Sequence, residues 1–352
     1  MYIPSMRVNK ARGKLKRRLV IIACGISVVI LVTAISFQVS PWPGVLLVRT
    51  VFNHDAHKVR VALEKHTTST PITVVPNQQY QQGNKKALLD VYTPQSAERS
   101  GQELPLVIWT HGGAWVSGDK TDAAPYFKLI AAQGFTVISV NYTLAPSKKY
   151  PTQIRELNEA HAYILANANR FHINPDKVFL AGDSAGSQLS SQMAALITDP
   201  GYAKQVGITP SLSRSQLVGV VLFCGIYKMA SLTEAAPNLP KIINWGDDQV
   251  VWAFTGTKAQ TSPVIRQVSP YYHVTKDFPA TFISGGNGDP LTNTQSIPLA
   301  SKLTSLGVPV TPLFYPASHT PSLPHEYQFN LDITNGKQAF SRTVEFLHAQ
   351  AR

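Results

Sequence analysis

The sequence predicts an α/β protein with a mostly parallel, eight-stranded sheet and helices on both of its faces. From residue 70 onward, β-rich runs alternate with helical ones, which is typical of parallel strands joined by right-handed crossovers. Several runs, such as LVIW, VISV and VGVVLF, are continuously apolar, as expected of strands that are covered on both faces. We expect strands at 72–75, 87–92, 105–110, 135–141, 177–181, 217–223, 280–284 and 308–315.

Helices are predicted where apolar residues recur at helical spacing, at 152–168, 188–197 and 337–349. The segment 226–275 breaks the alternation of strands and helices, because it is rich in Pro, Asn, Asp and Trp. We expect this segment to be a small lid or cap inserted over the sheet, where it would shape a pocket.

Basic residues are concentrated at the start of the chain. The formal net charge is +12, and residues 1–18 carry seven Lys and Arg with no acid. The remaining +5 is spread over more than 300 residues, so the folded part has no basic face and no nucleic-acid partner is expected.

The next segment, residues 19–37, contains no charged residue. As a helix it rises about 28 Å, close to the roughly 30 Å hydrocarbon core of a bilayer. It is therefore predicted to be a transmembrane signal anchor in contact with a lipid bilayer. The basic residues before it place the N-terminus in the cytoplasm and the rest of the chain on the other side.

Two other interpretations of this segment remain open. A cleaved signal peptide would make the protein secreted, although its apolar region is usually roughly 7–15 residues and no small-x-small cleavage site is evident. A lipoprotein would use Cys24, but the apolar run continues past it. Residues 38–69 are predicted to be a juxtamembrane linker. Within them, 42–65 could form an amphipathic helix against lipid or a linker packed on the folded domain.

The motif that suggests chemistry is KVFLAGDSAG at 177–186. A predicted strand ends at Gly182, Ser184 and Gly186 follow, and a helical pattern then begins. In G-x-S-x-G the glycines allow a tight strand-to-helix turn that presents the serine hydroxyl at the carboxyl edge of a sheet. Ser184 is thus the candidate nucleophile.

A second glycine motif follows an earlier buried strand, at His111-Gly112-Gly113. Acyl transfer creates a negative oxygen, and preorganised backbone N–H groups stabilise it. We assign Gly112 and Gly113 as donors, with the N–H of Ala185 at a helix N-terminus completing the oxyanion hole.

A serine nucleophile needs a histidine base and a carboxylate that orients it. Asp289 follows a predicted strand in a glycine-rich turn and is the candidate acid, whereas Asp183 adjoins the serine and should point elsewhere. His325 is favoured as the base, with His319 as the alternative. His161 lies on the apolar stripe of a helix and is interpreted as a packed residue.

Over roughly residues 85–350 the sequence resembles the α/β-hydrolase superfamily, specifically the hormone-sensitive-lipase-like carboxylesterases. The matching motifs are His111-Gly112-Gly113, Gly118-Asp119-Lys120, Tyr142-x-Leu144-Ala145-Pro146 with Tyr150-Pro151, Gly182-Asp183-Ser184-Ala185-Gly186 and Asp289-Pro290-Leu291. Gly-Gly-Ala-Trp in place of three glycines looks closer to acetyl- and feruloyl-esterase or formamidase relatives. His325-Glu326-Tyr327 replaces the usual His-Gly-Phe.

The resemblance implies an α/β-hydrolase fold and hydrolysis of small carboxylic esters, with short-chain acyl or aryl groups, through a Ser-His-Asp triad and an acyl-enzyme. It implies no metal and no cofactor. An amidase or peptidase with the same triad, or a catalytically silent binding protein, are the alternatives. The expected organisation is a basic cytoplasmic tail at 1–18, an anchor at 19–37, a linker at 38–69 and a catalytic domain at 70–352.

Overall fold

The computed structural model describes residues 5–232 and 241–352. Its centre is an eight-stranded sheet with the strand order β1-β2-β4-β3-β5-β6-β7-β8. The strands are β1 (Ile72–Gln79), β2 (Leu88–Pro94), β3 (Leu104–Thr110), β4 (Thr136–Val140), β5 (Ile173–Asp183), β6 (Leu217–Phe223), β7 (Ala280–Ser284) and β8 (Val310–Leu313). β2 pairs antiparallel with β1 and β4, and all other pairs are parallel. The predicted fold class is confirmed.

Eleven α-helices surround or precede the sheet in the described residues. They are α1 (Ser5–Val39), α2 (Trp42–Leu63), α3 (Gln95–Ser100), α4 (Ala124–Ala131), α5 (Thr152–Ala166), α6 (Ser184–Thr198), α7 (Pro200–Val206), α8 (Lys241–Thr255), α9 (Pro263–Gln267), α10 (Ile297–Ser305) and α11 (Thr334–Gln350). The three predicted helices correspond to α5, α6 and α11. α6 begins four residues earlier than predicted, at Ser184 itself.

The core lies on both faces of the sheet, which explains the continuous apolar runs. In β3, Leu106 and Ile108 join the buried cluster that contains residues of α5 and α6. Val107 and Trp109 point the other way, into the cluster that contains residues of α4 and α11. Successive side chains of a strand face opposite sides, so a strand covered on both faces has no polar positions.

A buried ion pair fixes the loop that follows β3. Lys120 donates from Nζ to the carboxylate of Asp90 at 2.9 Å, and both side chains are almost fully buried. The backbone N–H of Lys120 donates to Oδ1 of Asn141 at 2.6 Å. Removing one partner of such a pair typically costs about 3–5 kcal/mol, because the other charge is left buried and unpaired. The Gly118-Asp119-Lys120 motif therefore anchors the loop that carries Gly112 and Gly113.

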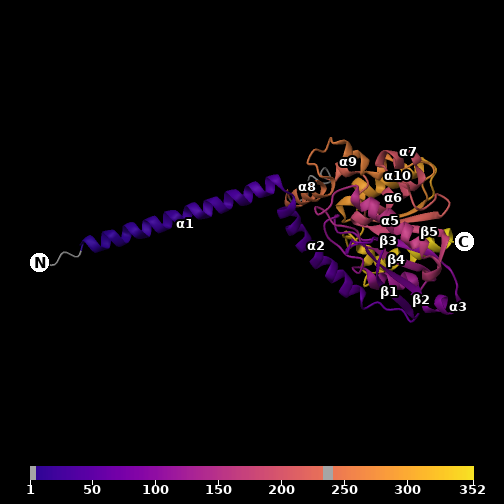
Figure 1. Cartoon of the computed structure of the whole chain (residues 1–352). Helices are drawn as coiled ribbons and strands as arrows, with labels where there is room; N and C mark the ends of the chain where they lie inside the picture. The colour runs from indigo at the N-terminus through magenta and orange to yellow at the C-terminus, as the bar shows by residue number, and fades with distance from the viewer. Residues whose placement is uncertain (1–4, 233–240) are drawn as a thin grey trace.

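α1 projects from the rest of the molecule as a single long helix (Figure 1). Its segment Lys16–Val39 is long and apolar enough to cross a membrane, and none of its most apolar stretch is buried in the protein. The predicted anchor at 19–37 lies inside this segment. A signal sequence near the N-terminus can also be this long and apolar, so the choice between anchor and signal peptide stays a prediction.

α2 occupies most of the predicted linker and packs on the body of the protein (Figure 1). Arg49 donates from its guanidinium to the carbonyls of Val116 and Ala145, at 2.6 and 3.2 Å. In the predicted lid, the described residues form α8, α9 and two short 3₁₀ turns, and α8 packs on α2. Residues 233–240 of that prediction lie outside the described residues.

Candidate active site

Ser184 lies at the sharp turn between β5 and α6, with a positive φ of 48°. A Cβ on Gly182 would lie 2.5 Å from the backbone of Gly186, and one on Gly186 would lie 1.9 Å from the carbonyl oxygen of Thr110. Both positions therefore require glycine. The turn, rather than the serine alone, places the hydroxyl at the carboxyl edge of the sheet.

Three side chains from distant parts of the chain meet at this edge. Nε2 of His325 lies 3.0 Å from Oγ of Ser184, and Nδ1 of His325 lies 2.9 Å from Oδ2 of Asp289. Asp289 is buried, and its other oxygen accepts the N–H of Leu291 at 2.9 Å. This is the hydrogen-bond chain that a nucleophilic serine requires.

The other two histidines discussed above lie elsewhere. His319, the alternative base, lies 3.3 Å from Nδ2 of Asn335 and packs its ring against Tyr315. His161, interpreted as a packed residue, is fully buried in α5, and burial lowers its pKa to about 4. Of the two predicted candidates for the base, His325 is the one within hydrogen-bond distance of Ser184.

The surroundings of His325 favour its charged form. Burial acts to lower its pKa, but neighbouring groups raise the pKa well above its ordinary value. Cys224 is one of these neighbours, yet burial raises the pKa of its thiol to about 11, so it is neutral at pH 7. The attraction therefore comes from Asp289, whose carboxylate stabilises an imidazolium.

Cys224, Asp289 and His325 place one potential metal-binding atom each within 4.8 Å of one another. However, both ring nitrogens of His325 already have partners, in Ser184 and Asp289. Coordination by either nitrogen would replace one of those hydrogen bonds. The donor set fits a proton-transfer chain better than a metal centre.

The N–H of Gly112, a predicted donor to the oxyanion, already has a partner in this structure. It donates to Oδ2 of Asp183 at 2.8 Å, while Oδ1 of Asp183 accepts the indole N–H of Trp109 at 2.7 Å. One N–H cannot serve the buried carboxylate and a substrate oxygen equally well. Asp183 points away from the serine, as expected, and holds the His-Gly-Gly loop in place.

Gly113 and Ala185 remain candidate donors. The first turn of α6 has no intrahelical acceptor for the N–H of Ala185. Among the described residues, no acceptor lies within hydrogen-bond distance of the N–H of Gly113. Gly113, Ala114 and Trp115 all have positive φ, so the loop turns sharply beside the serine.

A second carboxyl group, that of Glu326, lies beside Asp183. It is also 3.7 Å from Nε2 of His325. Burial, together with repulsion from Glu326, raises the pKa of Asp183 to about 7, and burial raises the pKa of Glu326. Each carboxylate disfavours ionisation of the other, because like charges repel where burial weakens solvent screening.

A cavity of about 230 Å³ opens next to Ser184. Its walls are mostly apolar and are formed by Phe52, Ala114, Trp115, Ile226, Leu232, Ile243, Asp247, Val250, Pro290 and Leu291, with Ser184, Asp289 and His325 at one end. Phe52 belongs to α2, and Ile243, Asp247 and Val250 belong to α8. Burial and Asp248 raise the pKa of Asp247 to about 7.

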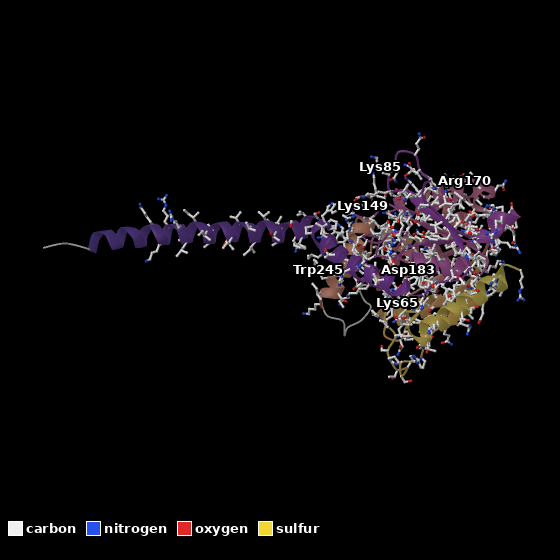
Figure 2. All side chains as sticks on the ribbon, turned by 90° about the horizontal axis from the view of Figure 1, so that it is seen from below. Lys65, Lys85, Lys149, Arg170, Asp183 and Trp245 are labelled. Carbon is white, nitrogen blue, oxygen red and sulfur yellow. The ribbon has the colours of Figure 1, made fainter. Side chains whose placement is uncertain are left out.

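Four residues near the triad or in the cavity wall have no role in the site predicted from sequence: Phe52, Cys224, Asp247 and Glu326. Of the four, only Glu326 was noticeable in the sequence, because it replaces the glycine of the His-Gly-Phe motif that is usual in the similar carboxylesterases. The other three reach the site through long-range packing. In Figure 2, Asp183 lies within the body of the protein, whereas Trp245 of α8 lies at the end from which α1 projects.

This sheet, with Ser184 at the strand-to-helix turn and Asp289 and His325 at the same edge, defines the α/β-hydrolase class. Residues 89–303 match the model of the BD-FAE family. The match covers more than half of the chain, and the chain belongs to this α/β-hydrolase esterase family.

Two relatives found by sequence comparison are esterases of Mycobacterium tuberculosis. The chain is 29% identical over 250 residues to carboxylesterase NlhH of Mycobacterium tuberculosis, covering 69% of this chain and 73% of the relative. It is 28% identical to esterase LipC of the same organism, covering 57% and 48%. The chain spans between a third and a half of the length of the first curated relatives it matches.

The fold is also found in solved structures. An inhibited esterase B from Lactobacillus rhamnosis aligns with a TM-score of 0.76 and 21% identity, covering 88% of this chain and 96% of that one. At this identity the likeness concerns the fold alone.

Proposed function

We propose that this protein hydrolyses carboxylic esters, with Ser184 as nucleophile, His325 as general base and acid, and Asp289 as the residue that orients His325. The observation that carries the proposal is the continuous hydrogen-bond chain from Ser184 through His325 to the buried Asp289. The esterase relatives support the same reaction class.

In the first step, Oγ of Ser184 bonds to the ester carbonyl carbon while its proton passes to Nε2 of His325. The carbonyl oxygen becomes anionic and accepts hydrogen bonds from the N–H groups of Gly113 and Ala185. The carbon–oxygen bond then breaks, and the alcohol leaves with the proton from Nε2. Water then attacks the acyl-enzyme while its proton passes to the same nitrogen. The bond between the acyl carbon and Oγ breaks, the proton returns from Nε2 to Oγ, and the carboxylic acid is released.

The cavity favours small apolar groups on the substrate. Its volume of about 230 Å³ lies below the roughly 300–1,000 Å³ of sites for drug-sized ligands. Its apolar walls suit a short acyl chain or an aryl group better than a charged group. The chemistry assigned to Ser184, His325 and Asp289 involves neither a metal nor a cofactor.

The test is covalent labelling with a fluorophosphonate, which reacts with an activated serine. We expect labelling of the wild-type protein and of Ser305→Ala, an exposed serine far from the site, but not of Ser184→Ala. Equal labelling of all three proteins would contradict the proposal. Hydrolysis of matched p-nitrophenyl acetate and p-nitroacetanilide then separates an esterase from an amidase.

We further propose that residues 19–37 are a signal anchor, with the tail 1–18 in the cytoplasm and the catalytic domain 70–352 on the opposite side. The apolar helix Lys16–Val39 and the basic residues before it support this topology. Alkaline extraction of membranes and the mass of the mature chain test it. Retention in the membrane at full mass is expected, and a soluble chain lacking its first residues would indicate signal cleavage.

A further inference from the structure

Large apolar side chains exposed to solvent gather in one region outside α1. Among the described residues beyond α1 they occur at nine positions, of which six are on α2, two on α8 and one, Ile297, on α10. We call the apolar flank the group Leu46, Leu47, Val51 and Phe52 of α2 with Ile242 and Ile243 of α8. Such a group is unusual on a surface that faces only water.

The start of α2 presents almost no charge beside this flank. Residues 42–53 contain one charged residue, Arg49, whose guanidinium is turned inward to the carbonyls of Val116 and Ala145. Acidic and basic residues appear only later in the helix, from Asp55 onward. The first three turns therefore expose apolar side chains without the charged groups that usually flank them on a soluble helix.

The flank adjoins the end of α1. Ser40 and Pro41 alone separate α1 from α2, and the ring of Phe37 lies 5.9 Å from that of Trp245 in α8. Nζ of Lys258 donates to the carbonyl of Gln38 at 2.6 Å. α1, α2 and α8 meet at one end of the domain (Figure 1), and Trp245 lies at that end in Figure 2.

α2 and α8 also form one packed unit rather than two separate helices. A Cβ on Gly44 would lie 2.6 Å from the side chain of Gln249, so the helices approach closely there. Two flank residues, Phe52 and Ile243, line the cavity that contains Ser184. The same unit thus has one side toward solvent and one side toward the candidate active site.

We propose that the apolar flank lies in the interfacial layer of the bilayer that α1 crosses. The cavity beside Ser184 then opens next to lipid, and its substrates are apolar esters dissolved in the membrane. Burying exposed apolar area stabilises contact with the interface by about 25 cal/mol per Å². We choose the bilayer as the partner of this surface because α1 is long enough to cross a membrane and its end adjoins the flank. The substrate class rests on the proposed ester hydrolysis, whereas the membrane contact does not.

The membrane contact is tested with the full chain in vesicles of phosphatidylcholine and phosphatidylglycerol. A fluorophore is attached to Leu47→Cys or Ile242→Cys in a Cys24→Ser background, and a lipid with a nitroxide near the headgroup serves as quencher. Val61→Cys is the matched control, because Val61 is an exposed apolar residue at the far end of α2.

We expect the labels at 47 and 242 to be quenched at least about threefold more strongly than the label at 61, since quenching needs contact with lipid. Equal quenching at the three positions would overturn the proposal. Crosslinking between two chains through residue 47 without quenching would assign the flank to a second copy and would also overturn it.

The substrate class is tested with a triple variant, Leu46→Ser, Leu47→Ser and Ile242→Ser, none of which lines the cavity. We expect kcat/KM for p-nitrophenyl hexanoate carried in vesicles to fall about fivefold, with p-nitrophenyl acetate in water unchanged. Val61→Ser should affect neither substrate. Unchanged hydrolysis of both esters by the triple variant would overturn the substrate class. If the wild type hydrolyses neither ester, the proposed function fails while the quenching result still decides the membrane contact.

Discussion

The turn at Ser184 and the apolar flank both border the same cavity, but they differ in how their side chains are held. Around Ser184 the backbone is crowded, and the buried carboxylate of Asp183 is paired with Trp109 and Gly112. The flank has exposed apolar side chains and no paired charges. The turn at Ser184 tolerates almost no change in geometry. The stability of the exposed flank depends instead on whether water or an apolar partner surrounds it.

This difference has a consequence for mutations. Substitutions at the carboxyl edge of the sheet should lower the rate of the chemical step or the stability of the protein, because they leave the hydrogen-bond partners of the replaced group unpaired. Changes on α2 and α8 should act on the choice of substrate or on the pH profile, and only where the side chain reaches the cavity or belongs to the apolar flank. The following four predictions test this contrast, from the largest effect to the smallest.

Replacing the base should have the largest effect. We expect His325→Ala to lower kcat/KM for p-nitrophenyl acetate by about 10⁴-fold or more, because Ser184 loses its proton acceptor. His319→Ala should stay within about twofold of wild type, since its ring contacts Asn335 and Tyr315. Loss of activity in His319→Ala alone would reject the assignment of the base.

Asp183→Asn should lower both stability and activity. An amide cannot accept from both Trp109 and Gly112 as the carboxylate does, so the loop that carries Gly113 loses an anchor. We expect the free energy of unfolding to fall by about 1–3 kcal/mol and kcat/KM to fall about 10- to 100-fold. Urea unfolding and steady-state kinetics measure the two effects.

The matched control is Asp199→Ala. Asp199 also accepts two backbone N–H groups, from Gly201 and Tyr202, but at the start of α7. The Asp199→Ala variant should lose about 0.5–2 kcal/mol of stability, because the helix loses its N-cap, while kcat/KM changes by less than about twofold. Equal loss of kcat/KM in the two variants would mean that Asp183 acts through general stability alone.

Asp247→Asn should shift the pH profile. His325 must be neutral to accept a proton, so kcat/KM falls as the pH drops through its pKa, which is raised above the ordinary value. Ionised Asp247 favours the imidazolium, and its removal should lower that pKa. We expect the acidic limb to move to lower pH by about half a unit. The control is Asp248→Asn, because Asp248 does not line the cavity; this variant should not move the acidic limb to lower pH. If the limb does not move in Asp247→Asn, then Asp247 has no electrostatic effect on His325.

Phe52→Ala should have the smallest effect. Phe52 contributes part of one cavity wall from α2, so we expect KM for p-nitrophenyl hexanoate to rise about threefold with kcat retained. Val61→Ala, on the same helix but away from the cavity, should leave both constants unchanged. A lower kcat in Phe52→Ala would instead mean that α2 positions groups that act in the chemical step.

The sequence predicted the features that local patterns determine. The eight strands are visible as apolar runs, and Gly182 and Gly186 indicate the turn that exposes Ser184. The direction of a side chain at that turn is set by neighbours far away in sequence. Asp183 was expected only to point away from the serine; the contacts that it makes there, with Trp109 and the N–H of Gly112, arise because β3 and β5 lie side by side.

The walls of the cavity could not be predicted for a related reason. Phe52 and Asp247 meet there because α2 packs on α8, about 200 residues later in the chain. No periodicity in either segment reveals its partner. The segment 226–275 was expected to cover a pocket, and the described part of it contributes α8, but the contribution of α2 depended on tertiary packing alone.

The link of two residues between α1 and α2 limits how the domain can turn relative to the helix before it. Under the proposed topology, such a short tether keeps the catalytic serine at a nearly constant height above the lipid. Encounters with substrate then become a lateral, two-dimensional search. Turnover would follow the mole fraction of ester among the lipids, and adding inert lipid at a fixed total amount of ester would slow the enzyme by surface dilution.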